Sequence, residues 1–415
     1  MFNVSGSELI KGTVKVPPSK SILHRALFLA ALSVENCELV GINLCSDIIA
    51  TINVLNALGI GVKVGANSIF ISSSINCEFL NADCANSGST LRFLICILAA
   101  LKIKAKLLCG EQLLKRLSKN ELERLKDFGI NCCMEKNTVY VSEELKSGEY
   151  CVAEQTTSQF ISGLMMASPL LEQSSKLKIS VNQGSLSYVL LTSEIMKSFG
   201  VDVQIKECEI YIPNAKYHAP AKFQVECDYS AASFWFVAAA LGFEITVQIK
   251  TPSVQGDFSI LRLLEKFGAI PIVCESGISF SVAVLSGCSI DARHIPDLVP
   301  ILMVLGALVP GQTKIMNVER LRFKESDRVV SMVMNLLAIG GDARYENGEI
   351  LINGKEGFVG GEVKSFGDHR IAMAMCIAAL KAKSGIEIDD ISCIKKSYPT
   401  FIADFLSLGG VIHGV

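Results

Sequence analysis

Apolar and polar positions follow a recurring order along the chain. Leucines and other apolar residues at helical spacing end at a glycine, and a short alternation of apolar and polar residues with a turn follows. Glycine is typical of the position after a helix because it adopts the left-handed backbone conformation without steric cost. The pattern therefore predicts a helix followed by a β-hairpin. The glycines at these predicted helix ends are Gly59, Gly129, Gly200, Gly268, Gly340 and Gly409.

These glycines are almost evenly spaced. Subtracting consecutive positions gives separations of 70, 71, 68, 72 and 69 residues. Regular self-similarity of this kind indicates repeated structural units. We interpret the chain as six α/β units of about 70 residues each, so that the fold class is α/β (α+β). Each unit has room for a second apolar helix, and five such helices are predicted at residues 21–32, 90–101, 157–169, 231–241 and 370–380.

The two ends of the chain complement each other. The sixth copy of the pattern stops before its second hairpin strand, whereas the first 16 residues contain two short strands without a helix before them. Because an unpaired strand edge tends to be covered, we expect the N-terminus to complete the last unit. This predicts two lobes of three units each, a discontinuous lobe of residues 1–18 and 227–415 and an inserted lobe of residues 19–226. A cleft between two lobes is the usual place for an active site.

Composition favours a globular protein and excludes several partners. Of 415 residues, 50% are hydrophobic and 19% are charged, and 39 Lys and Arg against 41 Asp and Glu give a net charge of -2. Such a balance provides no basic field for nucleic acid or an anionic membrane. The longest apolar stretches, residues 230–243 and 295–309, are shorter than the ~20 residues that span a bilayer. We expect no nucleic-acid or membrane partner and, since the start shows no leader pattern, a cytoplasmic location.

Cysteines and histidines do not form a recognisable metal motif. The fifteen cysteines are odd in number and irregularly spaced, and most lie in apolar runs or predicted strands. We interpret them as reduced core residues. The five histidines are scattered, and no Cys-x-x-Cys or His-Glu-x-x-His occurs. A zinc site built from these side chains is therefore not expected.

Charged residues gather where predicted strands run into helices. The five segments concerned are residues 17–25, 86–92, 157–160, 320–328 and 367–370. A helix N-terminus offers free N–H groups and a partial positive charge, which suit phosphate or carboxylate groups. Each segment alone is equally compatible with helix capping or surface ion pairs. Together, with Asp297 and Lys396, they predict two anionic ligands between the lobes and proton transfer near fixed cations.

Five of these motifs resemble those of the enolpyruvyl transferases, and most closely of the members that act on shikimate 3-phosphate. The motifs are SKSxxxR at 19–25, NSGSTLR at 86–92, TSQF at 157–160, KESDR at 324–328 and DHR at 368–370. The resemblance runs the full length of the chain. It implies a two-lobed fold of six βαβαββ-type repeats. It also implies transfer of the enolpyruvyl group of phosphoenolpyruvate to the 5-hydroxyl of shikimate 3-phosphate, with release of phosphate.

The same resemblance implies a tetrahedral intermediate, no metal or organic cofactor, a monomer, and a role in aromatic amino-acid biosynthesis as a glyphosate target. It assigns Lys20, Asp297 and Glu325 to catalysis and leaves open which of them performs each proton transfer. The implied shikimate 3-phosphate set is Lys20, Ser21, Arg25, Ser89, Ser158, Gln159, Ser185, Tyr188, Asp297 and Lys324. The implied phosphoenolpyruvate set is Lys20, Asn86, Gly88, Arg116, Gln159, Arg328, His369, Arg370 and Lys396.

Two other interpretations of the sequence stay open. The sister transferase that modifies UDP-N-acetylglucosamine is expected to carry a reactive loop cysteine and to lack the KESDR and DHR motifs. Cys109, near Arg116, is the one cysteine in a comparable region of this sequence. A non-catalytic repeat scaffold would explain six units but not the charged segments at their junctions.

Overall fold

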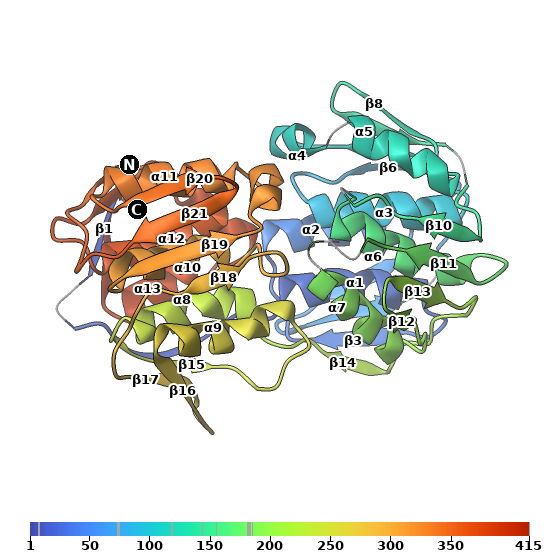
Figure 1. The fold of residues 1–415 in the computed structure, drawn as a ribbon. Helices are drawn as coiled ribbons and strands as arrows, with labels where there is room; N and C mark the ends of the chain where they lie inside the picture. Colours follow the sequence, from blue (N-terminus) through green and yellow to red (C-terminus); the bar gives the residue numbers. More distant parts are fainter. Residues whose placement is uncertain are drawn as a thin grey trace. The chain divides into compact units, whose positions relative to one another are not determined.

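The computed structural model describes residues 1–6, 9–72, 75–117, 119–142, 144–154, 156–180, 184 and 186–414. The chain divides into two compact units (Figure 1). The first unit contains Met1–Pro17 and Cys227–Val415, and the second contains Pro18–Glu226. The polypeptide therefore passes between the units twice, and each unit is described separately below.

Three four-stranded sheets form in the described part of the second unit, in the orders β14-β3-β5-β4, β6-β7-β9-β8 and β10-β11-β13-β12. In each sheet the first pair is parallel and the other two pairs are antiparallel. The strands are β3 (Cys37–Val40), β4 (Gly61–Val64), β5 (Ser68–Ser72), β6 (Phe79–Asp83), β7 (Lys104–Leu108), β8 (Cys132–Glu135), β9 (Thr138–Val141), β10 (Glu149–Cys151), β11 (Ser175–Lys178), β12 (Gln204–Lys206), β13 (Glu209–Ile212) and β14 (Lys222–Gln224).

Apolar helices occupy the centre of the second unit. Helix α3 buries 12 of its 13 residues, as expected of a helix that is apolar on all sides. It packs closely on α6 because Gly163 has no Cβ, which would lie 2.8 Å from the backbone oxygen of Arg92. The helices are α1 (Lys20–Leu32), α2 (Ser46–Ala57), α3 (Gly88–Ala100), α4 (Glu111–Arg116), α5 (Lys119–Glu123), α6 (Ser158–Ala167) and α7 (Leu186–Ser198), with short 3₁₀ segments η1 (Arg124–Phe128) and η2 (Ser168–Leu170).

The first unit also contains three four-stranded sheets in its described part, β16-β17-β15-β2, β18-β19-β21-β20 and β22-β23-β1-β24. Its strands are β1 (Phe2–Gly6), β2 (Lys11–Lys15), β15 (Glu244–Gln248), β16 (Ala269–Cys274), β17 (Gly277–Val282), β18 (Ser289–Asp291), β19 (Gln312–Met316), β20 (Ala343–Glu346), β21 (Glu349–Asn353), β22 (Gly361–Val363), β23 (Ile386–Ile388) and β24 (Gly410–His413). All six sheets of the described chain thus share one pattern of parallel and antiparallel neighbours.

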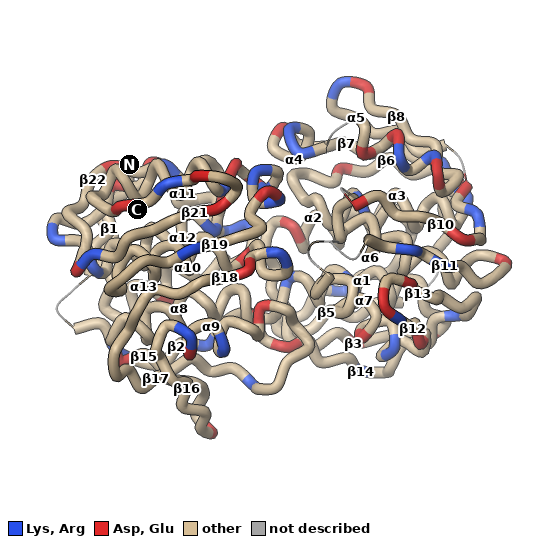
Figure 2. Tube along the Cα trace, viewed as in Figure 1, with Lys and Arg blue, Asp and Glu red and all other residues tan. Residues whose placement is uncertain are grey.

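Uncharged helices form the core of the first unit. Helices α8 and α10 contain no Lys, Arg, Asp or Glu, so both stay tan in Figure 2. The helices are α8 (Tyr229–Ala240), α9 (Ile260–Phe267), α10 (Val299–Leu308), α11 (Arg328–Ala338), α12 (His369–Ala379) and α13 (Phe401–Ser407), with 3₁₀ segments η3 (Gly256–Ser259), η4 (Glu319–Phe323) and η5 (Ser392–Lys396). Figure 2 shows that charge lies mainly on the strands, loops and helix ends.

The N-terminal strands join two different sheets. Strand β1 lies between β23 and β24, where Val4 pairs with Ile386 and Ile412, so the prediction that the N-terminus completes the last unit is confirmed for this strand. It is wrong for β2, which runs parallel to β15 from Lys11 opposite Glu244 onward. Strand β15 has β17 on one side only, and β2 supplies hydrogen bonds to its other edge.

The predicted helix ends are confirmed by backbone geometry. Gly59, Gly129, Gly200, Gly268, Gly340 and Gly409 have φ values of 85°, 82°, 83°, 100°, 91° and 103°. These values lie in the left-handed region, which ends a helix and which residues with a Cβ rarely adopt. The five predicted apolar helices correspond to α1, α3, α6, α8 and α12. The count of six sequence repeats is not tested by these features and stays a prediction.

Candidate active site

Lys20 and Arg25 lie on the first two turns of α1 in the second unit. The ammonium of Lys20 lies 3.0 Å from Oδ2 of Asp47, in the first turn of α2. Arg25 is buried, and its Nη1 donates to the backbone oxygen of Ser21 at 2.8 Å. Helix α1 therefore brings three members of the predicted substrate set to one helix end.

The guanidinium of Arg25 is bound by neutral groups. Nε donates to Thr192 at 2.8 Å, Nη2 donates to Ser162 at 3.0 Å, and Nη2 also lies 3.4 Å from the backbone oxygen of Tyr188. The cation also lies over the rings of Phe93 and Tyr188. Burial lowers the pKa of Arg25 to about 10, which still leaves it charged at neutral pH. No carboxylate is among its contacts in the described residues, so an anionic ligand would supply the missing counter-charge.

Arg92 connects several members of the predicted sites. Its Nη1 donates to Oε1 of Gln159 at 3.0 Å, and Nε2 of Gln159 in turn donates to Oγ of Ser89 at 3.0 Å. On its other side Arg92 forms a two-point ion pair with Glu121, at 3.1 and 3.0 Å. These bonds fix which end of the Gln159 amide faces Ser89.

Asn86, Gly88 and Arg116 lie beside this network. Nη2 of Arg116 donates to the backbone oxygen of Asn86 at 3.0 Å, and Oδ1 of Asn86 accepts from the backbone N–H of Leu113 at 3.3 Å. Gly88 begins α3, and a Cβ at this position would lie 2.8 Å from Nη1 of Arg92. Within the second unit, the structure therefore brings together two predicted phosphoenolpyruvate residues, Asn86 and Arg116, with Gly88 close by.

The remaining predicted residues of the second unit lie at two helix starts. Ser158 is the first residue of α6, and the side chain of Thr157 before it accepts from the backbone N–H of Phe160. Tyr188 lies in the first turn of α7, with its backbone oxygen toward Arg25. Ser185 lies outside the described residues.

Arg328 is the centre of a charge cluster in the first unit. It is buried and donates from Nη1 to Asp297 at 2.7 Å, from Nη2 to Glu325 at 2.9 Å and from Nε to Asp368 at 2.8 Å. Burial opposes the charge of Arg328, but the three carboxylates outweigh it and raise the pKa of the guanidinium. One buried side chain thus ties the start of α11 to the turn before α10 and to the residue that caps α12.

Asp297 contacts three cations. Besides Arg328, Nζ of Lys324 lies 3.6 Å and Nε of Arg370 lies 3.4 Å from its Oδ1. Burial lowers the pKa of Lys324, which Asp297 partly offsets. The structure therefore brings Asp297, Lys324, Glu325, Arg328 and Arg370 into one cluster within the first unit.

His369 and Lys396 are both buried in the first unit. His369 is the first residue of α12, and its Nδ1 lies 3.8 Å from Oδ1 of Asp368. Asp368 caps α12 by accepting from the backbone N–H of Arg370 at 3.0 Å, and it binds Arg328 as well. The alternative interpretation of this motif as a helix cap is therefore correct, but capping is only part of what Asp368 does. Lys396 ends η5.

Three carboxylates at these clusters were missed by the sequence interpretation. Asp47 pairs with Lys20, and Glu121 pairs with Arg92. Asp257 is buried in η3, where burial, followed by the charge of Asp297, raises its pKa to about 7. The polar run Gln255-Gly256-Asp257 before the amphipathic helix α9 was a signal for Asp257.

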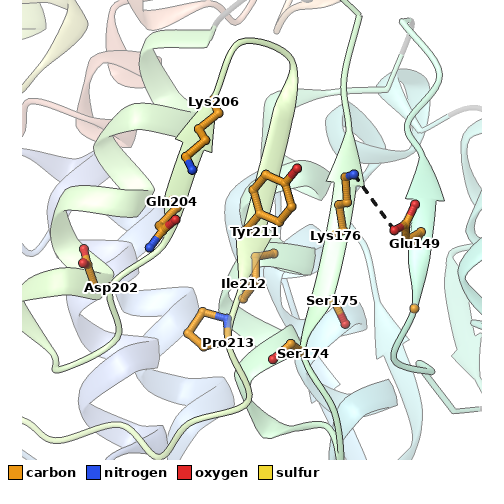
Figure 3. A pocket seen from close by; sticks show the side chains of 11 residues that line it. Glu149, Ser174, Ser175, Lys176, Asp202, Gln204, Lys206, Tyr211, Ile212 and Pro213 are labelled. Atoms are coloured by element: carbon orange, nitrogen blue, oxygen red, sulfur yellow. Dashed lines mark ion pairs between the residues drawn. The ribbon is translucent and has the colours of Figure 1, made fainter.

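A cavity of about 520 Å³ lies against the sheet β10-β11-β13-β12 of the second unit (Figure 3). The residues that line it are not members of the clusters described above. Figure 3 shows Lys176 pointing toward Glu149, and Lys176 also pairs with Glu209 at 2.8 Å. None of the predicted site residues lines it, and its lysine already has carboxylate partners. We do not assign substrate binding to this cavity.

Other kinds of site find no support in the part of the chain that the structure describes. No three His, Cys, Asp or Glu side chains gather there in a way that could hold a metal ion. Among the described helices, none is both long and apolar enough to cross a bilayer. None of the fifteen cysteines, all of which lie in the described residues, forms a disulfide, and Cys109 is buried, with its pKa raised to about 12 by burial and by Asp83. Such a thiol is not activated as a nucleophile.

Comparison with solved structures shows an enolpyruvyl-transferase fold. The chain matches the EPSP synthase of Acinetobacter baumannii with a TM-score of 0.79 and 23% identity, covering 99% of each chain. It matches an enolpyruvyl transferase of Streptomyces tendae with a TM-score of 0.78 and 16% identity, covering 99% of this chain and 98% of the other. The predicted fold class is therefore confirmed.

Sequence comparison narrows the class to one family. The profile of EPSP synthase (3-phosphoshikimate 1-carboxyvinyltransferase) matches residues 4–405. The 3-phosphoshikimate 1-carboxyvinyltransferase of Clostridium perfringens strain 13 is 38% identical over 414 residues, covering 97% of each chain. That of Clostridium kluyveri is 37% identical over 409 residues, covering 97% of this chain and 96% of its own. The chain belongs to the EPSP synthase family, and the resemblance seen in its motifs is confirmed.

Proposed function

We propose that this chain transfers the enolpyruvyl group of phosphoenolpyruvate to the 5-hydroxyl of shikimate 3-phosphate and releases phosphate, a step toward the aromatic amino acids. The observation that carries the proposal is the family match over residues 4–405, together with relatives named for this activity that are 37% and 38% identical over 97% of the chain. The buried cations at helix starts are consistent with two phosphorylated substrates.

The reaction we propose has two balanced steps. In the first, the 5-hydroxyl oxygen bonds to C2 of phosphoenolpyruvate, its proton passes to a base, and a proton adds to C3 to form a methyl group. In the second, the C2–O bond to phosphate breaks, and the methyl group returns a proton to the enzyme. Proton transfer at the 5-hydroxyl and at C3 needs positioned acids and bases. Lysine and carboxylate side chains can act as either an acid or a base.

We assign these roles to Lys20, Asp297 and Glu325. The assignment is supported by their surroundings in each unit, since Asp297 and Glu325 share Arg328 and Lys20 is paired with Asp47. A carboxylate held by fixed cations keeps its orientation while it accepts a proton. For substrate binding we propose the residue sets given above from the family motifs, with Arg25 facing an anionic group of shikimate 3-phosphate.

Phosphate release tests the function. The purified protein is mixed with phosphoenolpyruvate and shikimate 3-phosphate, and inorganic phosphate is measured over time. UDP-N-acetylglucosamine replaces shikimate 3-phosphate in a control. We expect release that depends on both phosphorylated substrates and none with the nucleotide sugar, and the reverse pattern would overturn the proposal in favour of the sister transferase. If no phosphate is released with either acceptor, the result would favour the non-catalytic scaffold.

We further propose a cytoplasmic monomer without nucleic-acid or membrane partners. The net charge of -2 is unsuited to a polyanion, and cysteines that form no disulfide are typical of a reducing compartment. Light scattering during gel filtration would test the monomer, with a mass near 44.8 kDa expected.

A further inference from the structure

A buried series of hydrogen bonds links the N-terminal parts of three helices in the second unit. Nδ1 of His24 in α1 lies 2.8 Å from Oγ1 of Thr51 in α2. Oγ1 of Thr51 lies 2.7 Å from Oγ1 of Thr90 in α3, which donates to Oγ of Ser87 at 2.7 Å. All four side chains are at most 1% exposed, so water does not compete for these bonds.

The hydrogen bonds of this series all run in one direction, from His24 toward Ser87. Because the hydroxyl of Thr90 donates to Ser87, its oxygen accepts from Thr51. The hydroxyl of Thr51 also lies 3.5 Å from the backbone oxygen of Asp47, to which it can donate, so toward His24 the oxygen of Thr51 accepts. Nε2 of His24 is buried without a partner among the described residues. Burial above all, with the nearby charges of Lys20 and Arg25, lowers the pKa of His24 to about 3, although Asp47 opposes this. The neutral ring thus carries its one proton on Nδ1.

Each residue in this series of hydrogen bonds lies close in sequence to a residue of the proposed site or to its partner. His24 follows Lys20 by one helical turn and precedes Arg25. Thr51 follows Asp47, the partner of Lys20, by one turn. Ser87 and Thr90 enclose the Gly88–Ser89 pair, and Ser87 caps α3 by accepting from the backbone N–H of Thr90 at 3.3 Å. The hydrogen-bonded chain therefore joins the Lys20 turn to the Gly88–Ser89 turn.

We propose that His24 is a positioning residue for the transferase reaction, which holds the Lys20 turn of α1 against the Gly88–Ser89 turn of α3 through Thr51 and Thr90. The inference rests on the proposed function. Apolar contacts in a helical core resist sliding weakly because they have no direction, whereas a hydrogen bond weakens steeply when its angle changes. A misplacement of roughly 1 Å can cost about 10²-fold in rate, so this alignment matters for catalysis.

Two substitutions of His24 separate alignment from packing. His24→Leu fills the site but has no donor, and His24→Asn places an amide nitrogen near the position of Nδ1. We expect kcat/KM to fall about tenfold or more in His24→Leu and to recover most of that loss in His24→Asn, while the two variants lose similar amounts of thermal stability. Phosphate release gives kcat/KM, and circular dichroism gives the melting temperature.

Thr51 provides an independent pair of variants if His24→Leu does not fold. Thr51→Val removes the middle hydroxyl with little change in shape, and Thr51→Ser keeps it. We expect Thr51→Val to lose about as much kcat/KM as His24→Leu and Thr51→Ser to stay near wild type. A matched control is Thr313→Val in the first unit, since the buried hydroxyl of Thr313 has no partner among the described residues. This control should keep wild-type kcat/KM.

A coupling measurement completes the test. If His24 acts through Thr90, the double variant His24→Leu with Thr90→Val should lose no more kcat/KM than the larger single loss. Additive losses would overturn the inference, as would His24→Leu with wild-type kcat/KM or equal losses in His24→Leu and His24→Asn. A wild-type protein without phosphate release would overturn the proposed function instead.

Discussion

The ammonium of Lys20 lies 3.0 Å from the carboxylate of Asp47, and both side chains are largely buried, at 15% and 9% exposure. The two residues are 27 positions apart and lie in the first turns of different helices, α1 and α2. The pair therefore fixes the lysine head by an interaction within one unit, before any substrate binds. A lysine held in this way is preorganised for a role in proton transfer.

Lys20→Met should lower kcat/KM by at least ~10²-fold, because it keeps the aliphatic stem but removes the charge and a proton carrier. It also leaves Asp47 buried without its cation, which should lower the melting temperature. Adding Asp47→Asn should restore much of the stability but none of the activity. The phosphate assay and thermal unfolding measure both. A Lys20→Met protein with more than about a tenth of wild-type turnover would show that Lys20 is not catalytic.

Gly88→Ala should weaken inhibition by glyphosate more than it weakens use of phosphoenolpyruvate. The added Cβ would lie 2.8 Å from Nη1 of Arg92 and 3.1 Å from Oε1 of Gln159. Nη1 of Arg92 must therefore shift, and because it donates to Oε1 of Gln159, the Gln159 amide should shift with it. A small shift there should reject the longer inhibitor more than the compact substrate.

The Gly88 prediction is checked by measuring the glyphosate inhibition constant and the phosphoenolpyruvate KM in both proteins. Gly65→Ala is a control, because Gly65 is exposed and the nearest atom to its added Cβ lies at 3.4 Å, in ordinary contact. Equal proportional changes in both constants for Gly88→Ala would mean that Gly88 does not line the space that separates the two ligands.

Local patterns in the sequence predicted the helices and their ends. The left-handed conformation at Gly59 and Gly268 follows from where an apolar helix pattern stops at a glycine, and such information lies within a few residues. The pairing of β2 with β15 was predicted wrongly because alternation shows that a segment is a strand but not which edge it joins.

The partners of the site residues could not be predicted for a related reason. Arg92 and Glu121 are 29 residues apart, and Arg328 and Asp368 are 40 apart. Such pairs depend on how helices pack, which one sequence does not reveal. Glu121 and Asp47 also lie outside the charged segments, where a carboxylate is indistinguishable from one on a solvated helix face. The motif residues themselves were recognisable because charge is rare in this chain.

Arg328→Lys should destabilise the first unit. A lysine head cannot reproduce the separate bonds from Nε, Nη1 and Nη2 to Asp368, Asp297 and Glu325, so at least one carboxylate loses its partner. Breaking a buried ion pair of this kind typically costs about 3–5 kcal/mol. Urea unfolding should show this loss, and kcat/KM should also fall because Asp297 and Glu325 lose their common anchor.

The control for Arg328 is Arg344→Lys. Arg344 pairs with Glu346 at 3.1 Å, but their side chains are 49% and 54% exposed. Surface pairs contribute at most about 1 kcal/mol, so this variant should unfold near the wild-type urea concentration. If both arginine variants lost the same small amount of stability, the buried cluster would not be the strong tie between α10, α11 and α12 that its geometry indicates.

Asp257 should make the stability of the protein depend on pH near neutrality. Burial, and next the charge of Asp297, raise the pKa of Asp257 from 3.8 to about 7 in the folded chain. Between these two values the folded state holds a proton that the unfolded state has released. The contribution of Asp257 to the free energy of unfolding is therefore largest below about pH 4. It declines as the pH rises toward 7, by at most about 1.4 kcal/mol per pH unit.

Asp257→Asn removes this titration, because an amide stays neutral throughout. We expect the unfolding free energy of Asp257→Asn to rise relative to wild type from pH 5 to pH 8, as measured by urea unfolding in steps of one pH unit. The matched control is Asp202→Asn, the same substitution at an exposed carboxylate. A constant difference for Asp257→Asn would contradict the prediction, because it would mean that Asp257 is ionised in the folded protein across this range.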